Sequence, residues 1–127
     1  MSPRKLADSR RPLRAKERQL VTALIASKGD NQRLAECLSD ILVEEMDDGG
    51  MGSLRFVDDR VDNRKFGAQV AEAAFLDEDG VPVSITLNID ERGELFELDL
   101  FKADNTPLRR FPLIGDIEFV SREHQTR

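Results

Sequence analysis

Two carboxylates at alternating positions of one predicted strand are the residues best placed to do chemistry. Glu97 and Asp99 are separated by a single residue, so in an extended strand their side chains point to the same face. The preceding predicted strand offers a matching row of polar side chains, Ser84, Thr86 and Asn88. Such a face could bind a cationic partner or a metal ion, but it is also typical of the solvated side of a half-buried sheet. The second interpretation is favoured, because nothing in the pattern predicts the dry pocket that a carboxylate needs to act as a general acid.

The second candidate is a glycine-rich run, DDGGMGS at 47–53, which holds three glycines within four positions. Backbone N–H groups can converge in such a loop and bind phosphate, but no lysine follows it and no helix start is evident after it. A hairpin tip that exposes Met51 to another protein is a better functional interpretation. A plain wide turn is the simpler structural one.

The remaining residue types that could support catalysis or metal binding lack partners. The turn DEDG at 77–80 suggests calcium, but a twelve-residue calcium loop would need a glutamate at the position of Asn88. Cys37 lies on the apolar stripe of a predicted helix and His124 in a predicted tail, so neither is expected to act as a nucleophile or base. The sequence therefore predicts no catalytic residue, no metal site and no cofactor.

Composition and charge narrow the class of protein. The chain has 127 residues, of which 35% are charged, and its net charge is −6. The first 18 residues carry seven basic side chains against two acidic ones, and the rest of the chain is acidic. An acidic body repels nucleic acid, and no aromatic residues interleave with the basic ones, so nucleic-acid binding is not expected. The single Cys excludes an internal disulfide, and neither a secretion signal nor a long apolar run occurs. We therefore expect a cytoplasmic protein without a membrane span.

Hydrophobic periodicity predicts two helices followed by antiparallel strands. Pro12 suits a first helical turn, and an apolar stripe continues from it to a stop signal at Gly29. A second helix is expected at 31–40. The strand-like segments lie at 41–46, 54–57, 66–76, 81–89 and 95–101, with a further edge strand near 117–120.

These elements predict an α+β fold in which two N-terminal helices pack on one face of an antiparallel β-meander of about five strands. Most of the seven Phe residues are expected in its core. The predicted organisation is a flexible basic arm at 1–10, a single α+β domain at 11–120 and a disordered tail at 121–127.

Three segments resemble a bacterial family of small domains of unknown function. They are MDDGGMGSLRF at 46–56, the DEDG turn at 77–80 and LFELDLFKADNTPLRRFP at 95–112. The family is marked by a DGGMGS stretch and a later Glu-Leu-Asp followed by an aromatic residue, a lysine and an aspartate. The resemblance covers about residues 11–113 and implies a bacterial cytoplasmic protein. It also supplies candidate binding positions without roles: Asp48, Gly49, Gly50, Met51, Gly52, Ser53, Glu97, Asp99, Lys102 and Asp104.

Without a complete catalytic site, the sequence favours a non-enzymatic protein-binding module, of the immunity-protein or antitoxin kind, that binds a basic partner by charge complementarity. Two alternatives stay open. One is a small-molecule-binding protein or enzyme that uses Asp48, Glu97, Asp99 and Lys102 around the glycine-rich turn. The other is a structural homodimer formed through an exposed strand edge. A concave pocket around these side chains would favour an enzyme, and a convex, solvated sheet face would favour a binding module.

Overall fold

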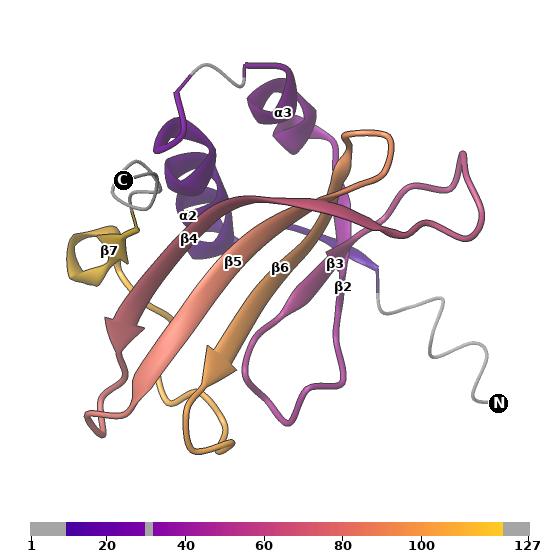
Figure 1. The fold of residues 1–127 in the computed structure, drawn as a ribbon. Helices are drawn as coiled ribbons and strands as arrows, with labels where there is room; N and C mark the ends of the chain where they lie inside the picture. Colours follow the sequence, from indigo (N-terminus) through magenta and orange to yellow (C-terminus); the bar gives the residue numbers. More distant parts are fainter. Residues whose placement is uncertain (1–9, 30–31, 121–127) are drawn as a thin grey trace, which may run out of the picture.

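A seven-stranded antiparallel sheet forms the body of the molecule in the computed structural model, which describes residues 10–29 and 32–120 (Figure 1). The strands are β1 (Arg11–Pro12), β2 (Leu42–Glu45), β3 (Leu54–Phe56), β4 (Phe66–Leu76), β5 (Pro82–Asp90), β6 (Leu95–Lys102) and β7 (Glu118–Phe119). Their order across the sheet is β1-β2-β3-β6-β5-β4-β7. The helices of the described part are α2 (Ala15–Ala26) and α3 (Gln32–Glu36), with 3₁₀ turns at Cys37–Ser39 and Ile114–Asp116.

The predicted fold class is wrong in its strand count and its topology. Only β4, β5 and β6 form a simple meander. β3 pairs with β6, with Leu54 opposite Leu98, so residues 42–56 extend the sheet on that side, and β7 extends it beyond β4. β1, β3 and β7 are two or three residues long, which is too short for an alternating pattern to show in the sequence. The fold is dominated by its sheet and is not a pair of helices on a five-stranded meander.

The chain enters the fold as an edge strand, whereas the sequence predicted a helix there. Pro12 pairs with Leu42 of β2, and α2 begins only at Ala15. Proline is tolerated in an edge strand because its missing N–H is not needed on the free side. Glu17 then fixes the helix start, because its carboxylate accepts a hydrogen bond from the backbone N–H of Arg14 at 2.8 Å.

The predicted second helix is shorter and less regular than expected. Of the range 31–40, α3 takes five residues and the 3₁₀ turn takes three, while residue 31 lies outside the described part. Cys37, expected on a buried stripe, is half-buried at the start of that turn. The predicted strand at 41–46 is confirmed as β2.

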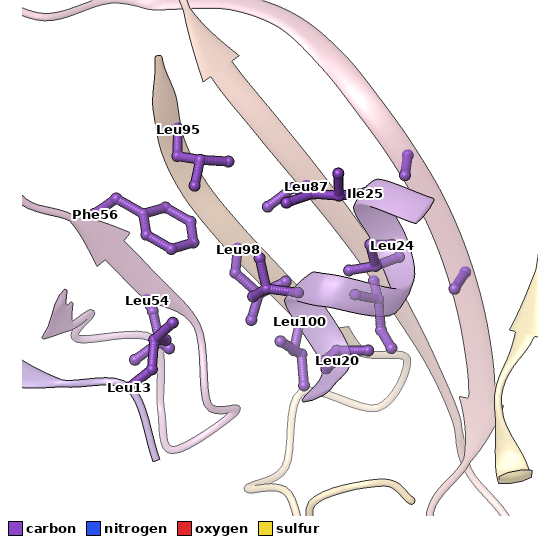
Figure 2. Close-up of a cluster of buried hydrophobic side chains, with 14 of the residues drawn as sticks. Leu13, Leu20, Leu24, Ile25, Leu54, Phe56, Leu87, Leu95, Leu98 and Leu100 are labelled. Atoms are coloured by element: carbon purple, nitrogen blue, oxygen red, sulfur yellow. The ribbon is translucent and has the colours of Figure 1, made fainter. Parts of the chain in front are cut away.

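One stripe of α2 covers the inner face of the sheet. Figure 2 shows Leu20, Leu24 and Ile25 of this helix in the same cluster as leucines of β5 and β6. Leu20 and Leu24 have no exposed surface, and burying a side chain of this kind contributes about 1.5–3 kcal/mol. The helix thus ties the chain's first part to the centre of the sheet.

Fewer phenylalanines are buried than predicted, so the core is built mainly from leucine, isoleucine and valine. Phe56, Phe75 and Phe96 are buried. The exposed ones are Phe66, Phe101 and Phe119, at 55%, 51% and 37% of their surface. Phe66 and Phe119 lie at the margin of the sheet, where no further layer covers them within the described residues.

The register of β5 and β6 assigns each of their side chains to one of two faces, because directly paired residues share a face. On the inner face Leu87 is opposite Leu98, and Ile85 is opposite Leu100. On the other face Thr86 is opposite Asp99, Asn88 is opposite Glu97 and Ser84 is opposite Phe101. We call this second side of the sheet the outer face. The shared face of Glu97 and Asp99 is confirmed. Ser84, Thr86 and Asn88 also share this face, but Asn88 is buried, whereas the sequence predicted a solvated row.

Most of the predicted arm and the whole predicted tail lie outside the described residues. From the arm only Arg10 is described, and its guanidinium forms ion pairs with Glu44 at 3.3 Å and Asp59 at 2.8 Å. In the part of the chain that the structure covers, no helix is both long and apolar enough to cross a membrane.

Candidate functional site

Lys102 is buried among acceptors at the end of β6. Its ammonium nitrogen lies 2.8 Å from an oxygen of Asp77, 2.7 Å from an oxygen of Asp79 and 3.2 Å from the carbonyl oxygen of Pro107. None of the lysine surface is exposed. An ammonium group has three N–H donors, and these acceptors account for all of them. We call Asp77, Asp79 and Lys102 the Lys102 cluster.

The pKa shifts of the cluster describe a stable ion pair. Burial raises the pKa of Asp77, but hydrogen bonds from Lys102 and from the backbone N–H groups of Arg109 and Glu78 outweigh it and hold the pKa at about 2. Burial lowers the pKa of Lys102, and its hydrogen bonds to the two aspartates reverse that effect and raise it. Both partners therefore stay charged at neutral pH. A general acid or base would need a pKa near neutral pH to exchange its proton, so this pair is not suited to that role.

The glycine-rich loop folds back onto β6 and does not project as an exposed tip. Met51 is only 6% exposed, and its sulfur accepts the backbone N–H of Lys102 at 3.4 Å. Asp48 accepts hydrogen bonds from the backbone N–H groups of Met51 and Ser53 at 3.1 and 3.0 Å. Gly50 accepts one from Leu108 through its carbonyl oxygen. The functional interpretation of this run, a tip that exposes Met51 to a partner, is therefore wrong.

Ser53 connects this loop to the middle of the sheet. Its hydroxyl donates a hydrogen bond to the carbonyl oxygen of Leu100 at 3.2 Å and accepts one from the N–H of Leu100 at 2.9 Å. The side chain thus replaces a strand partner just before β3 begins at Leu54. This arrangement is buried, so it contributes to the stability of the sheet.

The substitution Ser53→Ala is expected to destabilise the fold by about 1–3 kcal/mol, because both backbone groups of Leu100 lose their partner inside the protein. Urea unfolding followed by circular dichroism measures the change. The matched substitution Ser84→Ala, at an exposed position of β5, should change the stability by less than about 0.5 kcal/mol. Equal effects of the two substitutions would contradict the structural role given to Ser53.

The candidate residues of β6 face different sides of the sheet, with Lys102 on the inner side and Glu97 and Asp99 on the outer face. The glycine-rich loop packs beside Lys102, and Asp104 caps a nearby exposed turn by accepting the N–H and hydroxyl of Thr106. Glu97 and Asp99 belong to the outer face. An enzyme site that combined Lys102 with these two carboxylates is therefore not supported, because neighbouring residues of a strand point in opposite directions.

Three cross-strand rows make up the outer face. The first contains Gln69, Asn88, Glu97, Arg55 and Glu44, the second Glu72, Thr86 and Asp99, and the third Glu118, Ala74, Ser84 and Phe101. Beyond the third row Leu76 is opposite Pro82, and Leu76 is 66% exposed. We call Leu76, Pro82 and Phe101 the apolar corner. Carboxylates and an apolar corner thus lie side by side on one surface.

Asp99 is the carboxylate of this face with an unusual environment. Partial burial raises its pKa, the negative charges of Glu97 and Asp48 raise it further, and Arg55 opposes them. Arg55 itself forms its ion pair with Glu97 at 2.7 Å. Among the described residues no side chain donates a hydrogen bond to Asp99. A cation brought to this position would therefore find a carboxylate without a competing partner.

A family model described as a domain of unknown function, DUF6984, matches residues 10–112. The chain belongs to this family. Comparison with curated proteins and with solved structures finds no match. The match agrees with the extent that the resemblance indicated, and it places the Lys102 cluster, the glycine-rich loop and the outer face of β6 all within the DUF6984 domain. It gives no activity.

The DUF6984 domain also contains a buried ion pair that sequence reasoning missed. Arg64, which was assigned to a charged loop, is 9% exposed at its side chain and binds Asp90 at 2.9 Å. It also donates hydrogen bonds to the carbonyl oxygens of Phe56 and Leu95, both at 2.6 Å, and its guanidinium lies 5.1 Å from the centre of the Phe96 ring. No sequence signal identifies this arginine among its charged neighbours.

A separate cleft of about 470 Å³ lies between the 3₁₀ turn at Cys37–Ser39 and the loop after β3. Part of its charged rim is paired: Asp58 with Arg60 and Arg92, and Glu94 with Arg33. None of the predicted binding residues lines it. Within residues 10–29 and 32–120, no three or more His, Cys, Asp or Glu residues are placed to hold a metal ion.

Proposed function

We propose that this domain is a protein-binding module whose outer face binds a basic partner that also carries apolar side chains. The observation that carries the proposal is one sheet face on which the exposed Glu118 and the half-buried Glu72 and Asp99 lie beside the exposed apolar corner. The other polar groups singled out from the sequence are engaged in internal contacts. The side chains of the outer face are thus the ones that could contact a partner.

Charge complementarity defines the first requirement for the partner. Glu72, Asp99 and Glu118 lie on neighbouring strands of this face, and the basic side chains of its rows are limited to Arg55, which is bound to Glu97. Complementary charge steers association and excludes partners of the same sign. A surface rich in lysine or arginine therefore fits, whereas an acidic protein or a nucleic acid does not.

The apolar corner defines the second requirement. Phe101 and Leu76 expose half or more of their surface, beside the exposed Pro82. Aromatic side chains often contribute most of the binding energy of an interface, because they bury a large apolar surface and lose little conformational entropy. A partner that places apolar side chains on Phe101 and basic ones on Asp99 satisfies both requirements.

This chemistry is that of an immunity protein or antitoxin of a bacterial cytoplasm, where an acidic domain blocks a basic target. The alternative of an enzyme is less well supported, because Lys102 and the outer carboxylates occupy different faces. General acid–base work would require a carboxylate and its partner to converge on one reacting atom.

A titration with a defined peptide tests this surface directly. We expect a synthetic peptide of alternating lysine and leucine to shift the amide signals of Ser84, Thr86, Asp99 and Phe101 in ¹H–¹⁵N spectra. A peptide of alternating aspartate and leucine should leave them unchanged. The substitution Phe101→Ser is expected to weaken the lysine–leucine peptide by about tenfold or more, the loss typical of a central aromatic contact.

Charge reversal provides the matched control. Asp99→Lys should abolish the shifts at the outer face, whereas Glu91→Lys, at the exposed turn after β5, should leave the affinity within about twofold, because charges away from an interface act weakly through screened solvent. Shifts centred elsewhere on the domain, or equal effects of the two reversals, would reject the outer face as the binding surface.

A further inference from the structure

The cleft between the 3₁₀ turn at Cys37–Ser39 and the loop after β3 has the size of a small-molecule site. Its volume of about 470 Å³ lies within the roughly 300–1,000 Å³ that is usual for such sites. On its helical side, α3 lies next to the turn between β5 and β6 (Figure 1), where Arg33 pairs with Glu94 at 3.1 Å. This ion pair joins the helical wall of the cleft to the sheet.

One part of the cleft lining is apolar. Leu95 is buried, whereas Ile41 and Val57 are half-buried and Leu42 is 40% exposed. Apolar surface that becomes covered gains about 25 cal/mol per Å². The cleft therefore favours an occupant with a hydrocarbon part.

The charged part of the lining is acidic. It has five carboxylates, Glu36, Asp40, Asp58, Asp59 and Glu94, and a single basic side chain, Arg60. Asp58, Asp59 and Glu94 form ion pairs with arginines. Glu36 accepts a hydrogen bond from the neutral side chain of Gln32 at 3.1 Å. Within the described ranges, neither Glu36 nor Asp40 has a basic partner, so these two carboxylates can accept a cation.

Glu36 and Asp40 belong to the same wall of the cleft. α3 ends at Glu36, and the 3₁₀ turn leads directly to Asp40. The path between them is helical, and residues four apart on such a path are neighbours on its surface. One cation placed between the two carboxylates can therefore contact both.

We propose that this cleft binds a small organic cation in which a primary ammonium group is attached to an apolar body. The ammonium group lies between Glu36 and Asp40, and the apolar body packs on Leu42 and Val57. Hydrogen bonds between an ammonium and a carboxylate are among the strong ones, because both groups are charged. A bare metal ion fits less well, because the described residues contain no group of three or more His, Cys, Asp or Glu placed to hold one.

This site is additional to the function proposed above. The residues that line the cleft do not include Glu72, Asp99, Phe101 or any other residue used there, and the occupant is a small molecule rather than a protein. Loss of binding at one of the two surfaces therefore leaves the other prediction unaffected.

Phenethylamine is the probe, with two matched compounds as controls. Added to the full chain, it should cause saturable shifts of the amide signals of residues 36–42 and 57–60 in ¹H–¹⁵N spectra, and those of Ser84 and Phe101 should not move. Phenethyl alcohol keeps the apolar body without the charge, and methylamine keeps the charge without the body. Each should bind at least about fivefold more weakly, because each lacks one of the two contributions.

Neutral variants of the two carboxylates test their role. The double substitution Glu36→Gln with Asp40→Asn should weaken phenethylamine binding by about fivefold or more, the result of losing two partly exposed ion pairs. Asp62→Asn makes the same chemical change at an exposed position in the loop after β3, outside the cleft lining. It should leave the affinity within about twofold, because a charge in solvent is screened. Circular dichroism verifies that both variants fold.

The single cysteine of the chain provides an independent readout. Cys37 lines the cleft and is half-buried, so an occupant should slow the reaction of its thiol with dithiodipyridine. Phenethylamine should protect the thiol in the wild-type chain and protect it less in the double variant at the same concentration. Equal binding of phenethylamine and phenethyl alcohol would overturn the proposal, and so would shifts centred outside the cleft. Equal affinities of the double variant and Asp62→Asn would overturn it as well.

Discussion

The substitution Asp77→Ala is expected to lower the free energy of unfolding by about 3 kcal/mol, toward the loss that follows when one partner of a buried ion pair is removed. The carboxylate of Asp77 has no exposed surface and accepts hydrogen bonds from the ammonium group of Lys102 and the backbone N–H of Arg109, both at 2.8 Å. Its removal leaves the buried ammonium group with one acceptor fewer. The backbone N–H groups of Arg109 and Glu78 also lose the acceptor that Asp77 supplied. Urea unfolding at neutral pH measures the effect.

Glu78→Ala is the control, because Glu78 occupies the same turn but is half exposed and lies 3.8 Å from Arg110. An exposed ion pair of this kind contributes about 0–1 kcal/mol. A loss of stability in Asp77→Ala no larger than in Glu78→Ala would show that the Lys102 cluster does not hold this end of the sheet.

The same carboxylate sets a pH dependence. Asp77 has a pKa of about 2 in the folded protein, against about 3.9 in an unfolded chain. A carboxyl group whose folded pKa is lowered stabilises the protein fully above its unfolded pKa and loses that contribution as the pH falls through the folded value. The wild-type chain should therefore lose stability between about pH 4 and pH 2, and Asp77→Ala should show a smaller loss over this range.

The substitution Arg64→Ala is expected to destabilise the domain by about 3–5 kcal/mol, the range for an unpaired buried charge. The side chain of Asp90 is 1% exposed and would keep only its hydrogen bonds from Arg92 and the backbone N–H of Glu94. The carbonyl oxygens of Phe56 and Leu95 would lose the hydrogen bonds that Arg64 donates to them. Thermal and urea unfolding should both show the loss. We also expect faster proteolysis within residues 57–65, because Arg64 joins this loop to the sheet.

Arg60→Ala is the matched control in the same loop. The side chain of Arg60 is 70% exposed and binds Asp58 at the surface, so its removal should cost less than about 1 kcal/mol. A destabilisation by Arg60→Ala as large as that by Arg64→Ala would indicate that the loop's charges act collectively and that no single arginine anchors it.

The long strands could be predicted from the sequence because they are half-buried and follow the two-residue period of a sheet. Val83, Ile85 and Leu87 alternate with polar residues, and the structure places them on the inner face. The period fails at Ile89, which is half-buried, because a bulge in the pairing between β5 and β6 shifts the register there. Such a bulge leaves no distinctive composition behind.

The strand order could not be predicted, because it depends on pairings between distant segments. β3 meets β6 through Leu54 and Leu98, and neither three residues of β3 nor two of β1 or β7 specify a partner. The helix expected at Pro12 illustrates the same limit: proline fits both a helix start and an edge strand, and only the tertiary position of β2 decides between them.

One part of the candidate site could be predicted from the sequence and the other could not. The common face of Glu97 and Asp99 follows from their spacing alone. Lys102 was grouped with them because it belongs to the same segment, although its even position already placed it on the opposite face. Its partners Asp77 and Asp79 were interpreted as part of a hairpin turn, in preference to a calcium loop. The ion pair becomes visible only when the end of β6 is placed beside the turn after β4.

The alternation along β6 means that neighbouring residues of one short segment have different roles. Leu98, Leu100 and Lys102 specify how the chain folds, whereas Glu97, Asp99 and Phe101 specify what its surface offers. Under selection for a new partner, the odd positions can change while the even ones stay fixed, since their side chains contact different neighbours on the two faces. Relatives should therefore be compared by the parity of their positions in this strand. Overall identity in the segment would mix inheritance of the fold with inheritance of the binding preference.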